Sequence, residues 1–177
     1  MRGRKPIHGI KAFVWLGVSA TSVALVISAA SAAAPAMKPA AGTIHVYLVD
    51  TSLNPNARNN ILITGAFSDH GTGKNGIWVL TEGIIKVNNS AVAAIAKSPN
   101  WGTSYAASCS FDGVARGPVI IVSGTGAYAG ITGSLAFTLT EAGEGSLLKN
   151  GECNQSNNAP AVAEDLIGTG SGKVSFK

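Results

Sequence analysis

The chain has 177 residues, of which 46% are hydrophobic and only 12% charged, and it contains 22 glycines and two cysteines. Its 13 basic residues outnumber its nine acidic ones, but four of the basic residues lie within the first eleven positions, so the rest of the chain is formally neutral. A neutral chain lacks the basic face that nucleic-acid binding requires, and it is a poor partner for anionic membranes.

The N-terminal segment has the pattern of an export signal. Basic residues precede an uncharged apolar run over 12–30, and Ala30-Ser31-Ala32 fits the small-x-small cleavage pattern. We therefore expect a signal peptide over 1–32, cleaved after Ala32, and a secreted, extracellular protein. A transmembrane anchor is the alternative, because about 19 apolar residues nearly span a bilayer, but the Ala and Ser content favours removal. Residues 33–42 are expected to be a flexible lead-in, and residues 43–177 a single domain.

Strand signals fill the rest of the chain. Runs rich in β-branched and aromatic residues, each bounded by Gly, Asn, Asp or Pro, predict strands. These strands are expected over 43–50, 60–67, 76–81, 83–87, 105–111, 118–123, 133–140 and 171–176, and residues 146–148 could add a short one. Only residues 90–97 have a helical pattern, with Ser90 as the expected N-cap. Eight short strands predict an all-β antiparallel barrel or sandwich.

The most distinctive segment is residues 117–140, in which a Gly-rich stretch joins two apolar strands. Glycines there permit positive φ and close backbone approach, and Tyr128 stands among them. We expect its ring to cover one end of a barrel rather than to react.

Two cysteines, Cys109 and Cys153, remain in a chain that is expected to leave the cytosol. A single structural disulfide is the natural interpretation. The alternative, a reactive thiol, is disfavoured because neither cysteine stands beside a Lys, Arg or His that would lower its pKa.

Other motifs are interpreted as structural. Residues 71–76 satisfy G-x-G-x-x-G, but a strand rather than a helix is expected after them, so we expect a turn and no cofactor site. Asp69 and His70 are expected in a solvated loop, because a metal site needs three or four placed ligands. Neither a metal nor a cofactor is expected.

Two segments carry a resemblance to a known family. Residues 45–50, HVYLVD, resemble the first-strand motif of dirigent proteins, and residues 119–134, VIIVSGTGAYAGITGS, are similar to a hairpin shared by dirigents and plant allene oxide cyclases. The chain thus resembles the allene oxide cyclase and dirigent barrel superfamily, and also small secreted actinobacterial proteins that carry GTGAYAGITG. The resemblance implies an eight-stranded antiparallel barrel with an inner cavity, often trimeric.

The resemblance also implies site residues. Asp50 stands where dirigents have a first-strand aspartate, which makes it a candidate general acid or proton acceptor. The implied ligand-binding set is His45, Tyr47, Asp50 and Tyr128. The arginines of the dirigent hairpin and the glutamate of the cyclases are absent from this chain.

Three functions are compatible with these observations. The favoured one is a non-catalytic secreted barrel that binds a small apolar ligand inside or acts as a stable surface module. The second is a cyclase, isomerase or stereo-directing barrel, in which shape holds a reactive intermediate in one conformer. The third is an oligomeric cell-envelope protein, such as a homotrimer, that binds other proteins.

Overall fold

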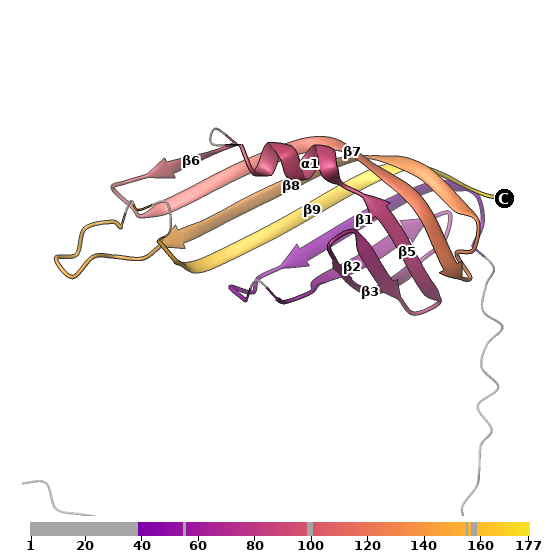
Figure 1. Ribbon diagram of the computed structural model, residues 1–177, viewed down its shortest axis with the longest axis horizontal. Helices are drawn as coiled ribbons and strands as arrows, with labels where there is room; N and C mark the ends of the chain where they lie inside the picture. The colour runs from indigo at the N-terminus through magenta and orange to yellow at the C-terminus, as the bar shows by residue number, and fades with distance from the viewer. Residues whose placement is uncertain (1–38, 55, 99–100, 155, 157–158) are drawn as a thin grey trace, which may run out of the picture. The chain divides into compact units, whose positions relative to one another are not determined.

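The computed structural model describes residues 39–177 except 55, 99–100, 155 and 157–158. The expected signal peptide, 1–32, and most of the expected lead-in lie outside the described residues. Figure 1 shows the strands of the described part curling into one sheet, with a single short helix beside it. In chain order the elements are β1 (Gly42–Asp50), β2 (Asn59–Gly65), β3 (Asp69–Lys74), β4 (Ile77–Leu80), β5 (Gly83–Asn88), α1 (Ser90–Ala96), β6 (Gly102–Tyr105), β7 (Ser110–Gly126), β8 (Ile131–Gly145) and β9 (Ala161–Phe176).

The sheet closes on itself. Its strand order is β5-β4-β3-β2-β1-β9-β8-β7-β6, and β5 also pairs with β7. That additional pairing closes a ring of eight strands and leaves β6 outside it, paired with the first residues of β7. Every pairing is antiparallel, so the expected eight-stranded antiparallel barrel is confirmed and the sandwich is excluded.

Strand β1 illustrates why these sequences form a barrel wall. Ile44, Val46 and Leu48 are buried, whereas the alternate residues His45, Tyr47 and Val49 are exposed. Successive side chains of a strand point to opposite faces, so a run with period two buries one face and solvates the other. The inner face of the barrel therefore contains the even-numbered residues of β1.

Side chains fill the ring. Eighteen of the described hydrophobic residues are buried in one cluster. Glycines on the inner face of β9 make room for the largest of them: a Cβ added at Gly170 would lie 2.5 Å from the Phe137 ring, and one at Gly168 would lie 2.7 Å from it. The Phe137 side chain thus packs against β9 where Gly168 and Gly170 have no side chains, which lets a large ring fit inside a barrel of this size.

The turn expected over residues 71–76 is wrong, because residues 69–74 form β3. The turn is confined to Asn75 and Gly76, whose φ angles are 52° and 74°. Gly71 serves close strand pairing instead, since a Cβ there would lie 2.0 Å from the Val79 carbonyl oxygen. Glycine usually weakens a strand, but here the tight approach of β4 requires it.

Four further expectations need correction. Residues 105–111 are not one strand, because a turn over 106–109 separates β6 from β7. Residues 146–148 form no strand; Leu147 makes an isolated bridge to Cys153. Helix α1 is confirmed, but its N-cap is Asn89 rather than Ser90, and no side chain caps it. Strands β7, β8 and β9 also run far beyond the predicted limits, with 17, 15 and 16 residues.

Within the part of the chain that the structure describes, no helix combines the length and the apolar character needed to cross a membrane.

Candidate functional site

One end of the barrel is closed by a buried carboxylate and a buried phenol. The Asp69 side chain is only 3% exposed and the Tyr128 residue only 1%. Asp69 accepts hydrogen bonds from the backbone N–H groups of His70 (2.6 Å), Thr81 (3.2 Å) and Glu82 (3.1 Å). The hydroxyl groups of Thr81 and Tyr128 also donate to it. The solvated loop expected at residues 69–70 is therefore wrong for Asp69, although His70 is exposed.

These contacts determine the charge states at this end. Burial alone would raise the pKa of Asp69, but the hydrogen bonds from Thr81, Tyr128, Glu82 and His70 outweigh it and hold the pKa below its usual value. Burial, the hydrogen bond to Asp69 and the charge of that carboxylate raise the pKa of Tyr128. The Tyr128 ring also packs 5.2 Å from the Phe67 ring, measured between ring centroids. The Asp69 carboxylate and the neutral Tyr128 phenol therefore close this end of the barrel structurally, which is the role expected for Tyr128.

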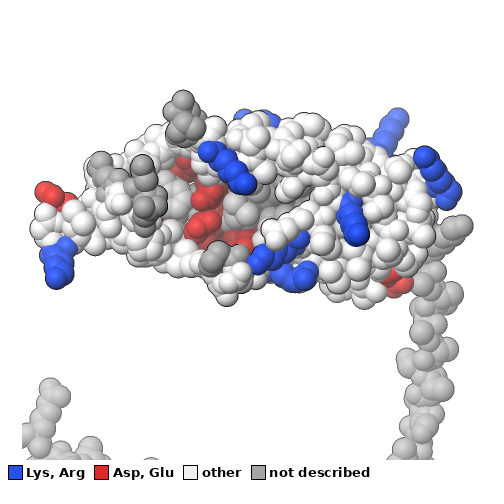
Figure 2. All heavy atoms as spheres, in the orientation of Figure 1, with Lys and Arg blue, Asp and Glu red and all other residues white. Residues whose placement is uncertain are grey.

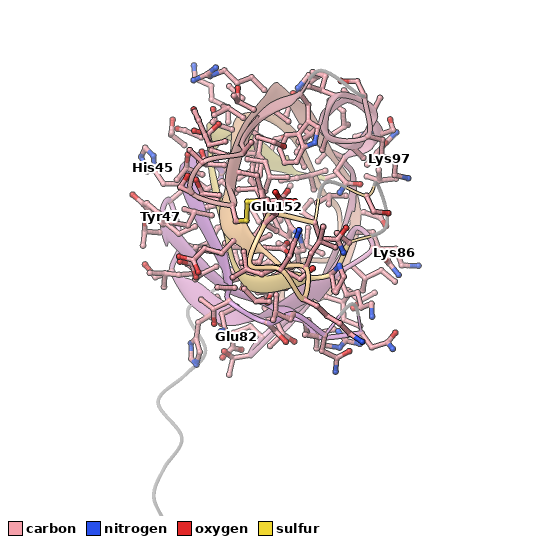
Figure 3. The ribbon with its side chains drawn as sticks, turned by 90° about the vertical axis from the view of Figure 1, so that its left-hand side faces the viewer. His45, Tyr47, Glu82, Lys86, Lys97 and Glu152 are labelled. Carbon is pink, nitrogen blue, oxygen red and sulfur yellow. A yellow bond between two sulfur atoms is a disulfide. The ribbon has the colours of Figure 1, made fainter. Side chains whose placement is uncertain are left out.

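The four ligand-binding residues implied by the resemblance do not share one site. His45 and Tyr47 lie on the outer wall, and Figure 3 shows both pointing away from the barrel. Tyr128 lies inside, under the closed end. Asp50 is half-buried at the end of β1, where its carboxylate accepts the N–H of Ser52 at 2.9 Å. Asp50 alone of the four borders a hollow near the opposite end.

That opposite end is extended by three long strands. Strand β1 stops at Asp50, opposite Leu166, and β5 stops at Asn88, opposite Ile120. Residues 110–113, 141–145 and 161–165 therefore continue past the closed ring, and together with β6 they form what we call the extension. Figure 1 shows it at the left, next to the described residues of the connection between β8 and β9, which covers 146–160. We call that connection the disulfide loop.

The extension holds a pocket of about 620 Å³, which we call the extension pocket. Its lining includes the aromatic residues Tyr105 and Phe111, the acidic residues Glu141 and Glu164, and Ser146 of the disulfide loop. Figure 2 shows acidic side chains gathered in a hollow between that loop and the body of the barrel. A neighbouring hollow of about 320 Å³, bordered by Asp50 and Lys74, shares Glu164 with the pocket.

Strand register brings the two glutamates together. Glu164 lies opposite Gly143, two residues from Glu141, so the two glutamates are diagonal neighbours on adjacent strands. Such neighbours are about 7–8 Å apart at the backbone, within reach of long side chains. Gly143 leaves the space between them open to the Phe111 ring, which a Cβ at Gly143 would meet at 2.5 Å. An aromatic ring therefore lies beside the acidic pair.

The neighbouring carboxylate affects the ionisation of Glu141. Burial, the negative charge of Glu164 and a hydrogen bond donated by protonated Glu141 to the Glu164 carboxylate all raise the pKa of Glu141. Two like charges in a partly dehydrated site disfavour double ionisation. Glu141 therefore keeps its proton to a higher pH than an ordinary glutamate does.

The disulfide supports the wall of this pocket. Cys109 and Cys153, which both line it, are joined with their Cα atoms 5.3 Å apart, so the expected disulfide is confirmed. A second hollow, of about 740 Å³, lies against the same loop, but Glu152 is the one acidic residue among the described residues of its lining, and Figure 3 shows Glu152 near the disulfide. The acidic pair distinguishes the extension pocket from that hollow.

Glu141 and Glu164 were not among the residues singled out from the sequence. Glu141 follows Phe137 and Leu139 at intervals of two residues, so a longer β8 would have placed it on the inner face. No sequence signal pairs it with Glu164, because that contact depends on the register between β8 and β9. Among the described residues, no group of three or more His, Cys, Asp or Glu is arranged to hold a metal ion.

In comparisons with known proteins, no protein-family model, no curated protein and no solved structure matches this chain.

Proposed function

We propose that this protein is a non-catalytic barrel that binds a small molecule, and that the molecule occupies the extension pocket rather than the ring of strands. The observation that carries the proposal is the contrast between the two spaces. Buried side chains fill the ring, whereas the extension pocket offers a volume of about 620 Å³. Small-molecule sites typically measure roughly 300–1,000 Å³ and combine apolar walls with a few polar groups.

The proposed setting is extracellular, as the N-terminal signal predicts. The Cys109–Cys153 disulfide supports it, because structural disulfides persist in oxidising compartments. Membership of the allene oxide cyclase and dirigent superfamily, and the homotrimer that it implies, stay predictions.

A pocket-filling variant tests the binding proposal. Gly145 lines the pocket, and a Cβ there would meet a single atom, the Cys109 carbonyl oxygen, at 3.5 Å. Gly145→Leu should therefore fold and occupy the binding space. We expect the purified protein to enhance the fluorescence of a neutral apolar dye such as Nile red, and Gly145→Leu to lower its affinity by about tenfold, equivalent to about 1.4 kcal/mol.

Ala142→Leu is the matched control, because Ala142 is exposed on the same strand. Its dye affinity should stay within about twofold of the wild type, the range expected for surface substitutions. Equal dye affinity of the wild type and Gly145→Leu would mean that the dye binds outside the extension pocket, and it would contradict the proposal.

A second function, acid-assisted isomerisation or cyclisation, is favoured by one observation, the raised pKa of Glu141 in the pocket. A carboxyl group that keeps its proton can donate it to a substrate oxygen and recover it when the product forms, so the reaction needs no co-reactant. The Glu164 carboxylate would accept the hydrogen bond of the Glu141 proton between turnovers.

If this second function holds, the protein should rearrange unsaturated epoxides faster than buffer alone does. Chiral chromatography of the products measures the rate and the enantiomeric ratio. Glu141→Gln should lower the rate by about 100-fold or more, the usual contribution of a general acid. The rate should also fall as pH rises through the raised pKa of Glu141, because the proton is then lost. A product yield and enantiomeric ratio equal to those in buffer would remove this candidate.

A further inference from the structure

The charges that line the extension pocket are all of one sign. Glu141 and Glu164 are acidic, and no Lys, Arg or His belongs to the described lining. The internal residues outside the described part, Pro55, 99–100, 155 and 157–158, carry no charge either. Lys74 borders the adjoining hollow, where its ammonium group donates to the Asn56 side chain at 3.5 Å. A ligand in the extension pocket thus meets a negative site.

The walls around the acidic pair combine aromatic and apolar residues with small polar ones, which are Ser104, Ser110, Ser146, Asn154 and Ser156. Phe111 packs over Gly143 beside the pair, and Tyr105 directs its hydroxyl to Asp112 at 3.3 Å while its residue lines the pocket. Ala106, Ala159 and Ala161 complete the apolar part of the lining. Aromatic rings attract cations through their faces as well as burying apolar groups. The aromatic and apolar residues suit the body of a ligand, and the acidic pair suits a positive group at its end.

One polar atom in the wall of the pocket has no hydrogen-bond partner among the described residues. The Ser146 hydroxyl oxygen is buried and makes no hydrogen bond to the described residues, and Ser146 lines the same pocket. The backbone of Ser146 is fully used, because its N–H donates to Pro160 and its carbonyl accepts from Asn154. A buried hydroxyl without a partner costs free energy. A ligand donor that reached it would recover part of that cost, and a hydroxyl oxygen can accept from an ammonium group.

We propose that the extension pocket binds an organic cation, specifically a primary amine attached to an apolar or aromatic body. This inference rests on the proposed binding function and names its ligand class. The ammonium group would lie between Glu141 and Glu164, while the body packs against Phe111 and Tyr105. A divalent metal is disfavoured, because the described residues supply two carboxyl groups there and no third ligand of that kind.

Three probes of nearly equal size test the ligand class by titration calorimetry. They are 4-phenylbutylamine, 4-phenylbutan-1-ol and 4-phenylbutyrate, which end in a cation, a neutral hydroxyl and an anion. At pH 7 we expect the amine to bind about tenfold more tightly than the alcohol, equivalent to about 1.4 kcal/mol, because hydrogen bonds between charged groups are stronger than neutral ones. The carboxylate should bind most weakly, because the acidic pair repels it.

Substitution of the pair separates charge from shape. Glu141→Gln and Glu164→Gln should each lower amine affinity by about tenfold and leave alcohol affinity within about twofold. Glu144→Gln and Asp165→Asn, at exposed positions on the same two strands, are the matched controls and should leave amine binding unchanged. The melting temperature of each variant establishes that it folds.

The outcomes distinguish this inference from the function on which it rests. Alcohol or carboxylate binding as tight as that of the amine, lost in Gly145→Leu, would overturn the amine class and keep the binding pocket. Absence of binding by all three probes and by Nile red would overturn both. Amine binding that survives both glutamate substitutions would also overturn the class, because the ammonium group would then have another partner.

Discussion

Asp69→Ala is expected to lower the free energy of unfolding by about 3–5 kcal/mol, a loss large enough to unfold a marginal domain. The reason is that five donors converge on this carboxylate, and three of them are backbone N–H groups. Removing the acceptor leaves donors unpaired in a largely dry site, each at a cost of about 1–3 kcal/mol. Urea unfolding followed by tryptophan fluorescence measures the change, because Trp78 is buried in the core.

Two neighbours serve as controls for Asp69. Tyr128→Phe removes one donor and keeps the ring, so it should cost about 1–1.5 kcal/mol. His70→Ala should change stability by less than about 0.5 kcal/mol, because the His70 side chain is 77% exposed. A loss below about 1 kcal/mol for Asp69→Ala would mean that the buried hydrogen bonds do not hold the closed end together.

The Asp69 effect should depend on pH in a defined direction. Its pKa is lower in the folded chain than the ordinary value near 3.8. Its contribution is therefore complete above the unfolded pKa, about 3.9, and is lost as pH falls through the lower folded pKa. The stability difference between the wild type and Asp69→Ala should thus be constant from pH 7 to about pH 5 and shrink below pH 4. A difference that stayed constant down to pH 2 would contradict the lowered pKa.

Removing the disulfide is expected to have an effect of similar size. Cys109 and Cys153 are 44 residues apart, and closing a loop of that length contributes roughly 4 kcal/mol through the entropy of the unfolded chain. The double substitution to serine should lower the free energy of unfolding by about that amount. It should also weaken Nile red binding, because both cysteines line the extension pocket.

A reducing agent is the natural control for the disulfide. It should destabilise the wild type and leave the Cys109→Ser, Cys153→Ser variant unchanged. The barrel pairings of β1 to β5 lie outside the closed loop, so the variant should keep a β-rich circular dichroism spectrum at low temperature. Loss of less than about 1 kcal/mol would mean that other contacts already hold the disulfide loop in place.

The sequence was sufficient for the elements that local patterning specifies. Alternation in β1 and the β-branched runs of β2, β4 and β5 predicted strands at nearly the observed limits. Strand β3 was not predicted, because its two glycines are typical of turns. In the fold they allow β4 to approach β3 closely, which local sequence does not indicate. The end predicted for β8 is too early for a similar reason, because its last five residues are only Gly, Ala and Glu. The start predicted for β9 is too late, because the Val162, Ile167 and Thr169 of its first part are interrupted by Gly, Ala and acidic residues.

The functional positions likewise divide into those that local sequence indicated and those that only the tertiary structure decided. Composition and the two cysteines determined an all-β chain with one disulfide, and the Gly-rich hairpin correctly indicated a buried Tyr128. Only the tertiary structure decided that His45 and Tyr47 face outward, that Asp69 bonds Tyr128 across 59 residues, and that Glu141 lies beside Glu164. These facts depend on which strands pair and in what register. A shift of one residue exchanges the two faces of a strand, and local sequence does not encode that choice between distant segments.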